Sequence, residues 1–217
     1  MSAGGFPCNT ALTLAGPAGA LEAVTLCPAP GTAVGASAVI LHPHSLHGGT
    51  LHNKVVHMLA RAFAGLGVAN LRFNFRGVGA SAGAFAHGDG ETEDVLAVID
   101  WLRAQRPHDA IWLAGFSFGA YVALRAARAA GVAGLVTVAP AVHLYDVSDL
   151  ELPDCPWLLV QGEADEVVPI AVIRSWIAKL GRPPQTRFLP EVGHFFHRRL
   201  PELTAALNEF VGPRLPR

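Results

Sequence analysis

The stretch AIWLAGFSFGAYVALRAARAA at residues 110–130 predicts a buried strand, a sharp turn and a helix in direct succession. Residues 110–115 form an apolar run, and the alanines and leucine that follow Gly119 favour a helix. Gly115 and Gly119 stand two residues before and after Ser117. A strand and a helix that meet at such a turn leave no room for side chains there, so glycine is the residue type that fits. The stretch therefore predicts a turn that lifts the Ser117 hydroxyl clear of a sheet.

Similar apolar runs alternate with helical patterns along the rest of the chain. Strands are predicted at residues 10–16, 21–28, 36–42, 68–75, 110–115, 132–140, 156–162 and 186–190, and helices at 52–67, 91–105, 119–131, 170–181 and 200–212. The continuous apolar run at 36–42 is typical of a strand that is covered on both faces. The element order predicts an α/β fold, with a twisted, mainly parallel sheet of about eight strands, helices on both faces and an antiparallel N-terminal edge.

Length and composition favour one domain that binds a small molecule. With 217 residues, 51% of them apolar, the chain is long enough for one well-filled core. We therefore expect a single domain over residues 1–217, with a frayed, flexible tail at 212–217. The 16 Lys and Arg nearly balance the 17 Asp and Glu, giving a formal charge of −1, and no basic run is present. Nucleic acids and acidic membranes are therefore not expected partners.

Targeting features and cysteines predict a cytoplasmic protein. Residues 1–10 lack the positive and apolar regions of a secretory signal, and no apolar stretch approaches the roughly 18 residues that span a bilayer. Cys8, Cys27 and Cys155 are odd in number, far apart and without C-x-x-C spacing, so reduced thiols are expected. A homodimer is a further expectation, based only on how common two-fold symmetric assemblies are.

A second G-x-S-x-G pattern, within GVGASAG at residues 77–83, contains Ser81. A strand precedes it, but the AGAFAHGDG that follows is too rich in glycine to form a helix. Its glycine spacing also differs from the dinucleotide-binding fingerprint, and no helix is predicted at that point to hold a pyrophosphate. We therefore expect Ser81 in a turn and Ser117 as the nucleophile.

A serine hydroxyl becomes a good nucleophile when a histidine takes its proton and a carboxylate orients that histidine. Asp165 follows the predicted strand at 156–162, and His194 follows the strand at 186–190. Because the carboxyl ends of parallel strands meet at one edge of a sheet, both side chains are expected beside Ser117. The order serine, acid, histidine is also the one that this kind of sheet uses.

The spacing leaves alternatives open for two of these roles. Glu163 and Glu166 flank Asp165 and could supply the carboxylate, in which case Asp165 would simply begin the next helix. His197 is the rival to His194, although we expect it in the first turn of the last helix. The geometry of such triads and the order along the chain favour Asp165 and His194.

Three segments resemble the nucleophile, acid and histidine segments of the α/β-hydrolase superfamily: GFSFG (115–119), GEADEVVP (162–169) and GHFF (193–196). Two more resemble a small bacterial subgroup of serine hydrolases without a lid, near the dienelactone hydrolases: LHPHSLHGGTLHNKVV (41–56) and LRFNFRGVGASAGAF (71–85). The resemblance spans nearly the whole chain and implies the α/β-hydrolase fold and serine hydrolase activity. It also implies that the loop around Ser81 lies beside the active site. Dienelactone hydrolases use a cysteine nucleophile, whereas this chain has Ser117.

An acyl-transfer site also needs hydrogen-bond donors for the oxygen that becomes negative. The backbone N–H of Phe118, directly after the nucleophile, should be one, and the loop HPHSLHGG at 42–49 should supply the other. The resemblance favours the amide of His44, with Ser45 second, and implies a proline where Ser45 stands. Pro43 has no N–H to donate.

Two other classes of function remain open. The cluster of His42, His44 and His47, with His52 and His57 beyond it, permits a metal-dependent hydrolase, because imidazoles are good zinc ligands. No acidic residue lies in this segment, and the same loop is already explained by an oxyanion hole, so we expect no metal and no cofactor. A non-catalytic binding protein on the same fold is the other alternative.

The segment between the sixth and seventh strands bears on the substrate. In the α/β-hydrolase superfamily a cap is usually inserted there, but AVHLYDVSDLELPDC at 141–155 is too short to build one. We expect an open site whose substrate contacts include Ser45, Phe116, His143, Leu144 and Phe195. The sequence thus predicts hydrolysis of small carboxylic esters or related acyl compounds through an acyl-enzyme. Thioesters, lactones and peptides share this chemistry.

Overall fold

The computed structural model describes residues 6–216 and contains one eight-stranded sheet. Its strands are β1 (Ala11–Gly16), β2 (Gly19–Leu26), β3 (Ala36–Leu41), β4 (Ala69–Phe73), β5 (Ala110–Phe116), β6 (Gly134–Val138), β7 (Trp157–Gly162) and β8 (Gln185–Leu189). The helices are α1 (Lys54–Gly65), α2 (Asp89–Gln105), α3 (Phe118–Ala127), α4 (Ile170–Ile177) and α5 (Leu200–Val211), with 3₁₀ turns η1 (Ser45–His47) and η2 (Gly212–Arg214).

The strands lie in the order β1-β2-β4-β3-β5-β6-β7-β8. Strand β2 pairs antiparallel with β1 and β4, and every other neighbouring pair is parallel. The predicted fold class is confirmed, including the antiparallel edge. Strands β3, β5, β6, β7 and β8 therefore all present their carboxyl ends at the same edge of the sheet, where ligand sites of open α/β sheets form.

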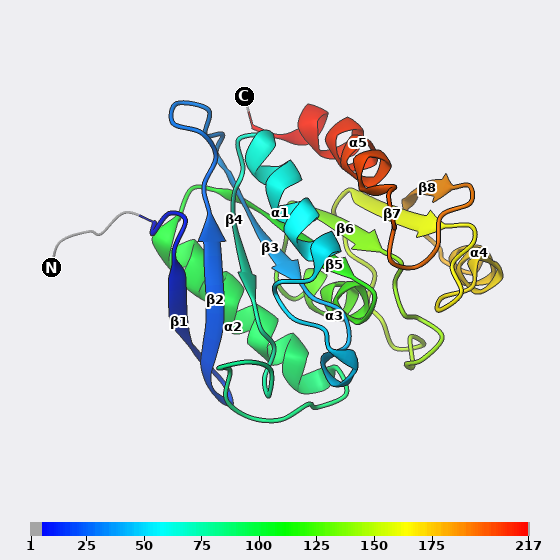
Figure 1. Cartoon of the computed structure of the whole chain (residues 1–217), viewed down its shortest axis with the longest axis horizontal. Helices are drawn as coiled ribbons and strands as arrows, with labels where there is room; N and C mark the ends of the chain where they lie inside the picture. The colour runs from blue at the N-terminus through cyan, green and yellow to red at the C-terminus, as the bar shows by residue number, and fades with distance from the viewer. Residues whose placement is uncertain (1–5, 217) are drawn as a thin grey trace, which may run out of the picture.

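Helices cover both faces of this sheet, as Figure 1 shows, with α1 and α5 on one side and α2 on the other. Side chains alternate along the buried strands: Ala38 and Ile40 of β3 face the helices α1 and α5, whereas Val39 and Leu41 face α2 and α3. The α4 residue Ile173 packs on the α2 and α3 side. The continuous apolar sequence of β3 thus reflects burial on both faces.

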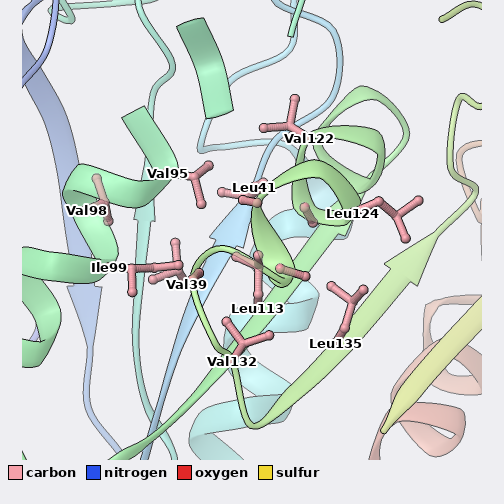
Figure 2. Packing of buried hydrophobic residues seen from close by; sticks show 14 of the residues in the cluster. Val39, Leu41, Val95, Val98, Ile99, Leu113, Val122, Leu124, Val132 and Leu135 are labelled. Carbon is pink, nitrogen blue, oxygen red and sulfur yellow. The ribbon is translucent and has the colours of Figure 1, made fainter. Parts of the chain in front are cut away.

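The core on the α2 and α3 side consists of branched aliphatic side chains that interlock across the layers. Figure 2 shows this packing between the sheet residues Val39, Leu41, Leu113 and Leu135, the α2 residues Val95, Val98 and Ile99, and the α3 residues Val122 and Leu124. Each such side chain contributes about 1.5–3 kcal/mol on transfer from water to the interior. This core holds α3 firmly against the sheet, and α3 follows Ser117 directly.

The segment between β6 and β7 has no helix or strand within residues 139–156, so no cap covers the carboxyl edge of the sheet. The tail that was expected to be frayed begins with the turn η2, and Leu215 packs against the core beside α1 and α5. Arg217 lies outside the described residues. No helix within 6–216 is both long enough and apolar enough to span a membrane.

The cysteines differ from their expected state, because Cys8 and Cys27 form a disulfide with a Cα–Cα distance of 5.3 Å. The hairpin register pairs Ala11 with Val24, and continuing it outward by three residues on each strand places Cys8 opposite Cys27. The expectation of three reduced thiols is therefore wrong, since it considered spacing and not hairpin register. Disulfides are rare in reducing compartments, so this pair weakens the argument for a cytoplasmic protein. Cys155 is free, and burial raises the pKa of its thiol to about 11.

Breaking the Cys8–Cys27 bond should lower the free energy of unfolding by about 2–4 kcal/mol, because the bond restricts the unfolded chain. Urea denaturation with and without dithiothreitol measures the effect, and the Cys8→Ser variant should not respond to the reductant. Alkylation of the unreduced, denatured protein should modify one cysteine. Modification of all three would contradict the pairing.

Candidate active site

Ser117 occupies the turn between β5 and α3 in a backbone conformation that few residues other than glycine adopt, with φ 56° and ψ −115°. Its N–H donates to the carbonyl of Val138 on β6 at 2.8 Å, and its carbonyl accepts from the amides of Ala120 and Tyr121 at 3.0 and 3.2 Å. These bonds tie the turn to the neighbouring strand and to the first turn of the helix. They hold a strained backbone in place, which is a known feature of functional sites.

The two glycines beside Ser117 are required by close backbone contacts. A Cβ on Gly115 would lie 2.2 Å from the carbonyl oxygen of Gly119, and a Cβ on Gly119 would lie 2.5 Å from the carbonyl oxygen of His42. Both distances are far shorter than van der Waals contact, and the atoms concerned belong to the backbone and cannot swing away. The strand, the helix and the end of β3 therefore meet at Ser117 only because these positions lack side chains.

The side chains of Asp165, His194 and Ser117 form a row of hydrogen bonds. His194 Nδ1 lies 2.9 Å from Asp165 Oδ2, and His194 Nε2 lies 3.1 Å from Ser117 Oγ. The side chain of Asp165 is fully buried, that of His194 is 4% exposed, and Ser117 is 7% exposed. The three predicted residues follow the ends of β5, β7 and β8, and they are thus brought together at the carboxyl edge of the sheet.

The carboxylate of Asp165 is held by further donors. Its Oδ1 accepts from the backbone amides of Val167 and Val168 at 2.9 and 2.7 Å, and its Oδ2 accepts from Gln161 Nε2 at 2.9 Å. Gln161 is not among the predicted site residues, although a polar residue near the end of the apolar run PWLLVQG is a signal for it. With His194 the carboxylate has four partners, so its orientation and negative charge are both stabilised.

The rival residues lie elsewhere. Glu163 pairs with Arg174 at 2.6 Å, and Glu166 accepts from the backbone amide of His194 at 3.3 Å rather than from its imidazole. His197 is exposed and accepts a hydrogen bond from the ammonium of Lys54 at 2.8 Å. The geometry therefore favours Asp165 and His194 over these alternatives.

A cavity of about 180 Å³, here called the Ser117 cavity, opens in front of the serine. It is lined by Pro43, His44, His47, Gly48, Gly49, Asn53, Ser117, Phe118, Ala141, Leu144, Val167, His194 and Phe195. Of the expected substrate contacts, Leu144 and Phe195 line it, and both are exposed. Phe116 is fully buried and does not line the cavity. Its ring centroid lies 5.0 Å from that of His194, so its ring packs against the imidazole. Ser45 and His143 do not line it.

Both expected oxyanion donors belong to residues that line the Ser117 cavity. Phe118 is the first residue of α3, so its N–H has no partner inside the helix. The carbonyl of His44 accepts from the amides of His47 and Gly49, which curls the loop around the cavity. Within residues 6–216 neither the amide of His44 nor that of Phe118 donates to a protein acceptor. The Ser45 hydroxyl is buried without a partner.

His42 takes part in backbone hydrogen bonds that leave no nitrogen for a metal. Its Nε2 accepts from the amide of Phe75 at 3.0 Å, so its Nδ1 carries the proton and donates to the carbonyl of Pro43 at 2.6 Å. The rings of His44 and His47 are stacked, 4.5 Å apart. In the described part of the chain, no three His, Cys, Asp or Glu side chains are arranged to hold a metal ion. This arrangement argues against the metal-dependent alternative.

Ser81 is buried in the loop after β4, as expected for a turn residue. Its hydroxyl donates to the carbonyl of Asn74 at 2.7 Å and accepts from the amide of Glu22 at 2.9 Å. The first bond lies within the loop and the second joins it to β2, so this serine has a structural environment and, among residues 6–216, no basic partner.

Residues 20–151 match the family described as X-Pro dipeptidyl-peptidase (S15 family). The chain is an α/β hydrolase of this S15 family. The hydrolase is similar to an α/β serine hydrolase without lid from Xanthomonas campestris, with 47% identity and a TM-score of 0.95 over 99% of each chain. An α/β serine hydrolase homologue from Coxiella burnetii is 42% identical, with a TM-score of 0.90 over 94% of this chain and 98% of that one.

A dienelactone hydrolase from Anabaena variabilis shares the fold at 19% identity, with a TM-score of 0.78 over 96% of this hydrolase and 98% of that chain. These likenesses confirm the resemblance to lidless serine hydrolases near the dienelactone hydrolases. They support a hydrolase activity and leave the type of bond that is cleaved to be inferred from the site.

Burial lowers the pKa of His42 to about 4, so the folded hydrolase keeps this ring neutral where the unfolded chain, with a pKa of about 6.5, binds a proton. The contribution of neutral His42 to the free energy of unfolding is therefore fully present above about pH 6.5. It falls by about 3 kcal/mol as the pH is lowered to about 4. Urea denaturation between pH 7 and pH 4.5 measures this slope. The His42→Asn variant should show a flatter pH dependence, and an unchanged slope would contradict the assignment.

Proposed function

We propose that this hydrolase cleaves small carboxylic esters through an acyl-enzyme on Ser117, with His194 as general base and acid and Asp165 as the residue that orients His194. The observation that carries the proposal is the row of hydrogen bonds, 2.9 and 3.1 Å long, from Asp165 through His194 to Ser117. A serine at the strained turn between a strand and a helix, facing a cavity, supports the role of nucleophile.

The geometry supports a specific path for the proton. Ser117 Oγ attacks the ester carbonyl while His194 Nε2 takes the hydroxyl proton, and the imidazolium is stabilised by the Asp165 carboxylate. The carbonyl oxygen becomes negative between the amides of His44 and Phe118, each worth about 2.7–4 kcal/mol in sites of this kind. His194 then protonates the leaving alcohol. Water, activated by the same histidine, attacks the acyl-enzyme and releases the acid and free Ser117.

The size of the Ser117 cavity supports a small acyl group. Its volume of about 180 Å³ is below the roughly 300–1,000 Å³ of sites that hold drug-sized ligands. The absence of a cap within residues 139–156 leaves the cavity open to solvent, so water can reach the acyl-enzyme and the alcohol can leave.

The family description favours a second candidate, the release of X-Pro dipeptides from the amino ends of peptides. The terminal ammonium of such a substrate needs an anionic or carbonyl partner near the reacting serine. The residues named above as lining the Ser117 cavity include no Asp or Glu. This distribution of charge favours esters, and a comparison of X-Pro p-nitroanilides with p-nitrophenyl esters decides between the two substrates.

The Ser117→Ala variant should lose esterase activity by at least about 10³-fold, because the nucleophile is removed while the fold is retained. The matched control is Ser81→Ala, which alters the other G-x-S-x-G serine. Hydrolysis of p-nitrophenyl butyrate and labelling by a fluorophosphonate measure both variants. Retained labelling of Ser117→Ala would contradict the proposal, and so would equal losses in the two variants.

Replacing Asp165 with Asn should reduce kcat for the same ester by about 10⁴-fold, because the amide cannot stabilise the imidazolium and favours the wrong tautomer of His194. The Glu163→Gln variant removes a neighbouring carboxylate that pairs with Arg174 at the surface, and it should stay within about two-fold of the wild type. Comparable losses in both variants would show that Asp165 has no special role.

A further inference from the structure

A second cavity, of about 690 Å³, lies between α1 and α5. We call it the basic groove, and it is lined by His52, Lys54, His57, Met58, Arg61, Ala62, Gly65, Leu200, Thr204 and Asn208. Four of these ten residues are basic and none is acidic. Helix α1 contains no acidic residue at all, and in Figure 1 it lies beside α5 on the same face of the sheet. Lys54 and Arg61 therefore place positive charge in the groove of a protein whose formal net charge, with histidines neutral, is −1.

The carboxylates of α5, which borders the groove, form ion pairs with arginines outside it. On α5, Glu202 pairs with Arg199, and Glu209 pairs with Arg187. Across residues 6–216, no carboxylate oxygen comes within ion-pair distance of Lys54.

Arg61, like Lys54, has no carboxylate partner in the described part of the chain, and Glu22 is a carboxylate that acts on His52. Arg61 makes no ion pair among the same described residues. Glu22 is a carboxylate whose charge reaches His52, and its Oε2 accepts from Asn74 and from the amide of Ala80. Burial, and then the charges of Arg72, Arg61 and His52, lower the pKa of His57. Cations gathered without a counter-charge repel one another, and an anion bound among them would relieve that repulsion.

The basic groove adjoins the site of the proposed reaction. Lys54 lines the groove, while the preceding residue, Asn53, lines the Ser117 cavity. The Lys54 ammonium lies 5.9 Å from the ring centroid of Phe195, and that centroid lies 5.1 Å from the centroid of His194. One exposed aromatic ring therefore separates a cation of the groove from the imidazole beside Ser117. Lys54 is also steadied by its 2.8 Å hydrogen bond to His197.

We propose that the substrate carries an anionic group, a carboxylate or a phosphate, at the end remote from the reacting carbonyl, and that the basic groove receives this group with Lys54 as a specificity-determining residue. The inference rests on the proposed function for the reaction itself. A chain passing from the Ser117 cavity over Phe195 would bring its anionic end to the Lys54 ammonium, with His57 and Arg61 farther along the groove.

Paired p-nitrophenyl esters test this substrate class. Each half-ester of a dicarboxylic acid, from succinate to suberate, is compared at low salt with the neutral ester of equal chain length. The ratio of kcat/KM, anionic over neutral, should exceed one at the chain length that reaches Lys54. It should decline as sodium chloride is added, since salt screens exposed charges. A ratio below one at every length would overturn the inference.

The chain offers a matched pair of variants, because Lys54 and Lys179 are its only lysines and Lys179 lines a different cavity. The Lys54→Met variant should lower the anionic-to-neutral ratio by about two- to five-fold, the size expected of one partly exposed charge pair. Lys179→Met removes the same charge and should leave the ratio unchanged. An equal effect in both variants, or an effect in Lys179→Met alone, would overturn the role of the groove.

Calorimetry separates this inference from the proposed function. Adipate and inorganic phosphate are each titrated into the wild type and into Lys54→Met. The groove should prefer one of these anions, and the variant should bind that anion more weakly than the wild type does. Anion binding that depends on Lys54, in a protein without esterase activity, would support the groove and refute the proposed reaction. Hydrolysis of neutral esters, with no anion bound and no anionic preference, would refute the groove alone.

Discussion

The site depends on the close approach of three backbone segments at Ser117. The end of β3, the end of β5 and the first turn of α3 lie so near one another that a Cβ at Gly115 or Gly119 would fall within 2.5 Å of a carbonyl oxygen. This approach forces the left-handed backbone at Ser117 and aims the N-terminus of α3 at the same point. The strain is balanced by the buried core that holds α3 on the sheet. Ser81, in the loop after β4, has a similar sequence around it, but a Cβ at Gly79 or Gly83 beside it would come nearest to side-chain atoms rather than to a backbone carbonyl.

The parallel pairing of the strands brings the other residues of the site to the turn at Ser117. Because β7 and β8 run in the same direction as β5, the loops after them end at the same edge, and they bring Asp165 and His194 to Ser117. The loop after β3 completes the surroundings with His44. Ser117, Asp165 and His194 lie in the turns and loops that follow strands, while β5 and β7 are mainly apolar, with Gln161 of β7 as a polar exception. Chemistry and stability are therefore supplied by different residues, which lets the loops vary on a constant fold.

Much of this arrangement follows from local sequence, and the remainder requires contacts between distant segments. The strands, the helices and the order of Ser117, Asp165 and His194 could be predicted, since each depends on a short pattern. Phe116 was expected at the rim, yet alternation along β5 places it with Trp112 and Ala114 on the face under α1 and α5. Predicting the Cys8–Cys27 disulfide requires the register of the β1–β2 hairpin, which the spacing of the cysteines alone does not give. The neutral state of His42 could not be foreseen, because its partner Phe75 lies in the loop after β4, 33 residues further along the chain.

The charge around the site shows why overall composition is a poor guide to specificity. A formal charge of −1 suggests that positive and negative charges are evenly distributed over the surface. However, the acidic side chains of α5 form ion pairs with arginines, so they do not pair with the cations of α1. That separation exists only where two helices, far apart in sequence, lie side by side. The low-dielectric walls of a cavity strengthen the field of such a cluster and raise the local concentration of anions. The residues that line the Ser117 cavity include no Asp or Glu, and this acts in the same sense, because such groups would attract cationic substrates or repel anionic ones. For the reaction proposed above, both features favour an anionic substrate, and both belong to residues beside the catalytic edge rather than to the fold that supports them.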